Sequence, residues 1–106
     1  MAKKVAVTYT TASAFHTLGL PDADDLVLRA ELMRRIGEII EARGLTQTRA
    51  GAVMHMDQPR VSALLKGKIT KFSTDRLLKA LSDLGQDVEV RITPARKGKG
   101  RLRVAA

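Results

Sequence analysis

The stretch TQTRAGAVMHMDQPRVSALLKG, residues 46–67, decides the fold of this chain. Thr46 and Asp57 each precede a run of helix-compatible residues, and both side chains are good helix N-caps. His55 and the residue after it separate the two runs. The stretch therefore predicts two short helices, the first ending near Met54, joined by a tight turn.

Small and apolar residues stand where two crossing helices need them. Two helices that cross steeply must approach closely at one point, and Gly51 supplies a residue without a side chain there. Val61 and Leu64, three residues apart, supply the apolar side chains that pack against the first helix. Pro59 fits the first turn of the second helix, and Gly67 closes it. The pattern predicts a helix-turn-helix.

A long helix is predicted upstream, from Pro21 to Arg43. Pro21 suits a first helical turn, and Gly44 suits the end of a helix. The aspartates near the start are stabilised by the positive end of the helix dipole. Its expected buried stripe consists of Leu26, Ala30, Met33, Ile36 and Ile40, widened by Leu28, Leu32 and Ile39. Because this apolar surface is wider than one narrow face, part of it is expected to pack on a partner chain.

Downstream of the helix pair, the sequence predicts one more helix and a strand. Ser73 is the expected N-cap of the helix and Leu84 its end, with Phe72 packing on Leu77 as a hydrophobic staple. Residues 87–93 alternate strictly between polar and apolar side chains. This alternation predicts a half-buried strand.

The predicted strand needs a partner, because a lone strand cannot satisfy its backbone hydrogen bonds. Three partners are open: the weakly strand-like segment Val5–Tyr9, the same strand of a second subunit, or another protein. We expect Val5–Tyr9 to be loosely ordered, as chain termini commonly are. Residues Ser13–Leu18 are compatible with one helical turn.

The length of 106 residues and the formal net charge of +8 fit one basic domain with a modest core. We divide the chain into a flexible N-terminal segment at 1–13, a domain with the helix pair and the strand at 14–93, and a basic disordered tail at 94–106. The tail holds five basic residues and no acidic one. Two interpretations are open for it: a solvated end that aids solubility, or an arm that contacts phosphates.

The composition excludes several classes of function. Without cysteine, a disulfide framework, a thiol nucleophile and cysteine-ligated zinc are excluded, and a cytoplasmic location is expected. His16 and His55 are too isolated for a metal site or a catalytic dyad, so we predict no enzyme, no metal and no cofactor. An aromatic content of 3% disfavours binding of single-stranded nucleic acid by base stacking. No apolar run approaches the roughly 18 residues of a membrane span.

The second helix of the pair carries side chains that suit DNA on its expected outer face. Gln58 is suited to the edge of adenine and Arg60 to that of guanine, with Ser62 beside them. Gln47 begins the first helix of the pair, where backbone amides attract a phosphate. The lysines that follow the second helix, suited to neutralising phosphates, are Lys66, Lys68 and Lys71. The alternative for each of these residues is a solvated side chain without a ligand.

Two of these patterns resemble the XRE (Cro/C1-type) helix-turn-helix regulators: TQxxxG at 46–51 and QPRVSxLLxGK at 58–68. The stretch LGLPDADDLVLRAELMRRIGEIIEARGLTQ, residues 18–47, resembles a branch of that family which includes antitoxins of the HigA type. The likeness covers roughly residues 13–93. It implies an all-α fold, a lambda-repressor-like helix-turn-helix bundle of four to five helices with a C-terminal β-strand. Such proteins typically form dimers.

The resemblance also implies which residues contact operator DNA. The positions that match the contacting residues of the family are Gln47, Gln58, Arg60 and Ser62. His55 departs from the family, which usually has glycine in the turn, although histidine tolerates a left-handed backbone better than most residues. Arg49 stands where many members have glutamate or a neutral residue.

Two functions follow as hypotheses. The first is a sequence-specific regulator of transcription, a repressor that binds double-stranded DNA as a homodimer with the second helix of the pair in the major groove. The alternative is an antitoxin that binds a toxin protein and represses its own operon. In that case the strand and the N-terminal segment are the expected toxin-binding surfaces.

Overall fold

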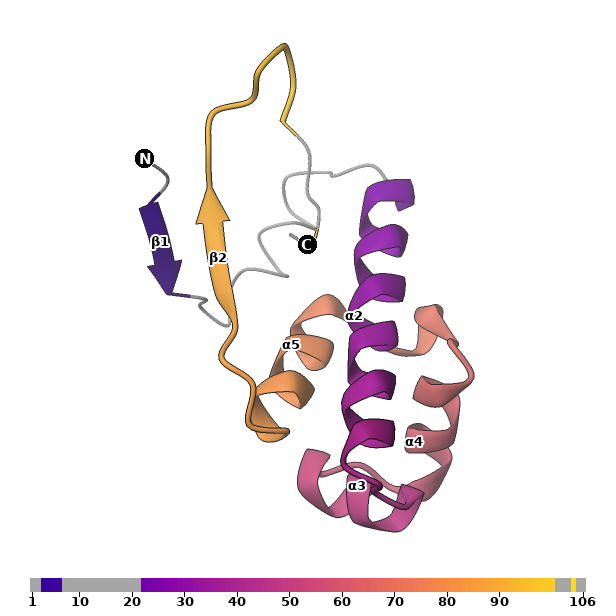
Figure 1. Ribbon diagram of the computed structural model, residues 1–106. Coiled ribbons are helices and arrows are strands. Elements are labelled where there is room, and N and C mark those ends of the chain that lie inside the picture. Colours follow the sequence, from indigo (N-terminus) through magenta and orange to yellow (C-terminus); the bar gives the residue numbers. More distant parts are fainter. Residues whose placement is uncertain (1–2, 7–21, 101–103, 105–106) are drawn as a thin grey trace.

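The computed structural model describes residues 3–6, 22–100 and 104, and helices make up most of this part of the chain. Its elements are β1 (Lys3–Ala6), α2 (Asp22–Ala42), α3 (Gln47–Met54), α4 (Gln58–Leu65), the 3-10 turn η1 (Ile69–Lys71), α5 (Thr74–Asp83) and β2 (Glu89–Ile92). The long helix α2 runs through the bundle, with α5 on one side, α4 on the other and α3 across its end (Figure 1). The expected helix-turn-helix bundle with a C-terminal strand is confirmed.

The buried face of α2 is displaced from the predicted stripe. Ile36 is at its centre and is fully buried, and the other buried residues of this helix are Leu28, Leu32, Met33 and Ile40. Leu26 is only partly buried and Ala30 is exposed, although both belonged to the predicted stripe. Because α5 and α4 pack on two sides of α2, the buried arc of this helix is wide, and it includes Leu28 and Leu32.

Three helix starts predicted from the sequence are confirmed by side-chain caps. In each one, a side-chain oxygen accepts a hydrogen bond from the backbone N–H three residues further on, at 2.9 to 3.1 Å. The pairs are Thr46 with Arg49, Asp57 with Arg60, and Ser73 with Arg76. These caps satisfy amides that would otherwise lack an intrahelical partner, and so they fix where α3, α4 and α5 begin.

The close approach predicted at Gly51 is present where α3 meets α4. A Cβ atom at Gly51 would lie 2.5 Å from the carbonyl oxygen of Met56 and 3.3 Å from Cγ2 of Val61. Val61 and Leu64 are buried, as expected for the side chains that face α3. The missing side chain therefore lets the backbone after the turn pass directly over α3.

A polar network that no local sequence pattern predicts joins α2 to the following elements. Thr74 is buried at the start of α5, and its hydroxyl donates a hydrogen bond of 3.2 Å to Oδ1 of Asp25. The other carboxylate oxygen of Asp25 pairs with Arg29, which also donates to the carbonyl oxygen of Ile69 at 3.4 Å. The network connects α2 with η1 and α5 through the Asp25 carboxylate and the guanidinium of Arg29.

The predicted strand has its partner within the same chain. β2 pairs with β1 in antiparallel register, with Lys3 opposite Ile92 and Ala6 opposite Glu89. Residues 3–6, expected to belong to a flexible segment, thus form a strand, because β2 offers them backbone hydrogen bonds. The remainder of Val5–Tyr9 beyond residue 6, and the helical turn expected at 13–18, lie outside the described residues.

The strand is less buried than its alternation predicted. Val88 packs partly buried against the core, and Val90 is also partly buried. Ile92 is 65% exposed, although it lies on the same side of the strand as these two valines. The apolar side of β2 therefore meets the bundle at its beginning and extends past it at its end.

Gly51→Ala is expected to destabilise the fold by at least about 2 kcal/mol, because the new methyl group forces the Met56 backbone away from α3. Gly37 offers a matched control inside α2, since its Cβ would meet only Cδ2 of Leu65, at 3.9 Å. Gly37→Ala should stabilise the protein by about 0.5 to 1 kcal/mol, because alanine loses less entropy in a helix. Urea denaturation followed by circular dichroism measures both changes, and equal effects would contradict the close approach at Gly51.

Candidate nucleic-acid interface

The start of α4 presents the residues that the sequence assigned to DNA. Val61 and Leu64 anchor the helix in the core, each with at most 1% of its surface exposed. Gln58 and Arg60 are exposed, and Ser62 is partly buried. The structure thus places these three predicted residues on one short helix that Val61 and Leu64 anchor in the core.

The other predicted residues surround α4. Gln47 is exposed as the first residue of α3, and Lys66 is exposed at the C-cap of α4. Lys68 is exposed at the N-cap of η1, and Lys71 is exposed as its last residue. Ala63, which follows Ser62 on α4, packs partly buried against the core.

The turn between α3 and α4 has the left-handed backbone that its position requires. His55 has φ of 58° and ψ of 46°, and its backbone N–H donates to the carbonyl of Gly51. Only a few non-glycine residues adopt this conformation, with asparagine, aspartate and histidine the most frequent. The departure from glycine at this turn therefore leaves the helix-turn-helix geometry intact.

Arg76 holds this turn from α5, a role that the sequence analysis missed. Its Nη2 donates to the carbonyl oxygen of Met54 at 2.7 Å and to that of His55 at 3.4 Å. These carbonyls end α3 and have no intrahelical donor. The only signal in the sequence was an arginine near the N-terminus of a helix, where a cation is unfavourable for the helix dipole and therefore suggests another role.

Charge is distributed unevenly between α2 and the helix pair. Residues 22–42 hold six acidic and three basic side chains, whereas residues 43–72 hold six basic side chains and one acidic, Asp57. The Asp57 carboxylate is the N-cap of α4. The surface around α4 is therefore the basic part of the bundle, as a surface that meets DNA phosphates must be.

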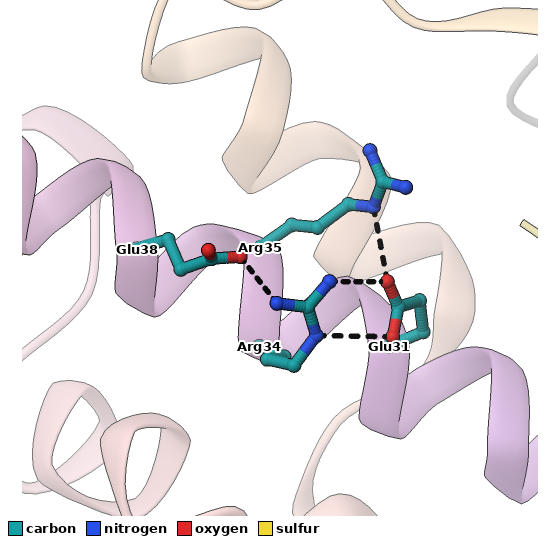
Figure 2. A network of polar contacts seen from close by, with 4 residues as sticks. All are labelled: Glu31, Arg34, Arg35 and Glu38. Atoms are coloured by element: carbon teal, nitrogen blue, oxygen red, sulfur yellow. Dashed lines mark hydrogen bonds and ion pairs between the residues drawn. The ribbon is translucent and has the colours of Figure 1, made fainter. Parts of the chain in front are cut away.

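The arginines of α2 pair with carboxylates of the same helix. Figure 2 shows Arg34 between Glu31 and Glu38, with N···O distances of 2.7 and 2.6 Å, and Arg35 beside Glu31 at 3.2 Å. The hydrogen bond from Arg34 is the main cause that lowers the pKa of Glu31 to about 2. Because these charges neutralise one another, α2 contributes little net positive charge to the surface.

Within the described residues, no group of three or more His, Asp or Glu side chains is placed to hold a metal ion. None of the helices in this part of the chain is long and apolar enough to span a membrane. Of the basic tail, Arg96, Lys97 and Lys99 are exposed, and Arg101 and Arg103 lie outside the described residues.

Comparison with known proteins supports this geometry. A family model described as a helix-turn-helix domain matches residues 14–93. A solved structure that bears the name of an XRE family transcriptional regulator superimposes with a TM-score of 0.74 at 35% sequence identity, covering 81% of this chain and 99% of the other. The chain belongs to the XRE family of helix-turn-helix proteins. No curated protein matches it.

Membership of this family places the protein among DNA-binding transcriptional regulators. The two quoted sequence patterns at 46–51 and 58–68 correspond to the helix pair α3 and α4. The family resemblance inferred from these residues is thereby confirmed.

The Glu31 carboxyl should titrate with a pKa of about 2, because ionised Glu31 accepts hydrogen bonds from Arg34. A carboxyl whose pKa is lowered by folding stabilises the protein above its ordinary pKa of 4.5, and this stabilisation is lost as the pH falls toward about 2. Carboxyl chemical shifts measured by NMR give the midpoint directly. Arg34→Ala should move the Glu31 midpoint upward, and an unchanged midpoint would show that Arg34 is not the cause.

Proposed function

We propose that this protein is a sequence-specific repressor that binds double-stranded DNA as a homodimer, with α4 in the major groove. One observation carries the proposal: α4 is fixed by Gly51 and Val61 so that Gln58 is exposed at the helix start, on the basic surface of the bundle. A helix presented in this way matches the docking geometry of helix-turn-helix proteins, whose second helix contacts base edges with its N-terminal residues.

The exposed residues take separate roles in this proposal. Gln58 suits the N6 and N7 atoms of adenine, and Ser62 is able to contact several bases. Gln47 lies at the N-terminus of α3, where its side chain and the nearby amides suit a phosphate. Lys66 and Lys68 neutralise phosphates beside the groove.

A dimer is part of the proposal because α4 has only eight residues and covers few base pairs. Two copies with α4 helices about 34 Å apart would bind a near-palindromic operator and double the number of bases that are read. Among the described residues, Val27 on α2 and Ile92 on β2 are the most exposed large apolar side chains, at 67% and 65%, and both suit a subunit contact. A cytoplasmic location, inferred from the absence of cysteine, belongs to the same proposal.

An antitoxin is the second candidate function, and the strand β2 favours it. In the sheet that the described residues form, β2 pairs with β1 along one edge, and addition of a strand to a sheet edge is a common way of binding a protein partner. Ile92, at the end of this strand, is 65% exposed and suits an apolar pocket of a partner. A neighbouring gene that encodes a small protein, whose product copurifies with this chain and whose toxicity this chain suppresses, would support the antitoxin; a neighbour without toxicity contradicts it.

Gln58→Ala should reduce discrimination between operator and random DNA by about 1 to 3 kcal/mol, because a base-edge contact is lost. Lys66→Ala should instead weaken binding to both DNAs equally and lower the slope of log K against log salt by about 0.9. Fluorescence anisotropy with promoter fragments at several salt concentrations measures both quantities. If no fragment binds the unmodified protein better than random DNA at moderate salt, the proposed function is wrong.

A further inference from the structure

Arg60 lies on a different side of α4 from Gln58 and Ser62. Residues four apart share one side of a helix, so Gln58 lies next to Ser62, whereas Arg60 lies next to the buried Leu64. The Cζ atom of Arg60 is 5.2 Å from the centre of the Phe72 ring. Its side chain is therefore held toward the segment that follows α4, and not along the outer face of the helix.

That segment brings two lysines to Arg60. Arg60, Lys68 and Lys71 line one hollow, together with Phe72. All three cations are exposed, and the ion pairs found in the described part of the chain involve none of them. Asp57 also lines the hollow, but its Oδ1 already accepts the backbone N–H of Arg60. Three cations against one engaged carboxylate leave the hollow clearly positive.

The contact with Phe72 determines what the guanidinium is able to bind. The aromatic ring attracts the cation, and the guanidinium N–H groups remain available to a ligand. Phosphate oxygens are the acceptors that suit several converging cations, since each N–H to oxygen bond is charge-assisted. A guanine edge would instead require the same side chain to extend along the outer face, beside Gln58.

We propose that Arg60, Lys68 and Lys71 form one binding subsite for a phosphate of the DNA backbone, and that Phe72 is the positioning residue that holds Arg60 in it. The inference rests on the proposed function, since it takes DNA as the ligand of this surface. It assigns Arg60 to the backbone and not to the guanine edge that its residue type alone suggests. Recognition of bases by α4 then depends on Gln58 and Ser62.

The test compares Arg60→Ala with the unmodified full-length protein by fluorescence anisotropy, on the best-binding promoter fragment and on a random duplex. Arg60→Ala should weaken binding to both duplexes by the same factor. A fourfold rise in salt should weaken the variant about 3.5-fold less than the unmodified protein, as expected for one phosphate contact fewer. Arg60→Lys should retain most of the affinity and of the salt dependence, because a lysine also pairs with a phosphate.

Two outcomes overturn the subsite. One is a fall in the ratio of promoter to random affinity in Arg60→Ala, which shows that Arg60 distinguishes bases. The other is an unchanged salt dependence. Gln58→Ala is the matched control on the same helix, and its ratio should fall while its salt dependence stays the same.

The role of Phe72 is tested by Phe72→Leu in two backgrounds. In the protein with Arg60, the change should weaken binding to both duplexes, since the guanidinium loses its platform. In the Arg60→Ala background it should have no further effect. An equal loss in both backgrounds, the result expected if leucine only perturbs the fold, overturns the positioning role.

Failure of the proposed function is distinguishable from failure of the subsite. If the unmodified protein binds no fragment better than random DNA, sequence-specific regulation is wrong. The salt dependence of Arg60→Ala on random DNA still decides the phosphate subsite, because that measurement needs no preferred sequence.

Discussion

The absence of a side chain at Gly51 is the constraint on which the rest of the structure depends. The carbonyl oxygen of Met56 lies only 2.5 Å from the position that a Cβ atom would take, so the backbone after the turn is in direct contact with the backbone of α3. The turn must then reverse the chain within very few residues, which it does through the left-handed conformation of His55. Asp57 starts α4 immediately afterwards. The exposure of Gln58 therefore results from the close approach at Gly51, and not from any contact of Gln58 itself.

Hydrogen bonds from arginine side chains to the ends of helices supplement the packing of the hydrophobic core. Arg76 donates to the carbonyls that end α3, and Arg43 donates to the carbonyl of Leu84 at the end of α5, at 3.0 Å. Carbonyls at a helix end lack intrahelical donors, and the negative end of the helix dipole also stabilises a nearby arginine. In this way α5 is fastened to α2 and α3 at points where apolar packing alone would leave polar groups without partners.

Features encoded by neighbouring residues could be predicted from the sequence, and features made by distant residues could not. The caps at Thr46, Asp57 and Ser73 were predictable because the side chain and the amide it accepts from are three residues apart. The pairing of Arg76 with Met54 joins residues 22 apart, and no local pattern signals it. The side of α4 on which Arg60 lies follows from the periodicity of the helix. The contact of Arg60 with the Phe72 ring depends instead on how η1 packs against α4. Residue type alone therefore identified a surface for DNA without distinguishing a base contact from a phosphate contact.

Acidic and basic side chains are distributed unequally over the bundle. Residues 22–42, which form α2, hold six acidic side chains against three basic ones, whereas residues 43–72 hold six basic side chains against one acidic one. The pairs of Arg34 and Arg35 with Glu31 remove positive charge from the middle of α2, so the field of the bundle is not spread evenly over its surface. A molecule with such a separation turns in the field of a polyanion before contact. Orientation is thereby established by long-range charge, while the choice of sequence is left to the few side chains of α4 that reach the bases.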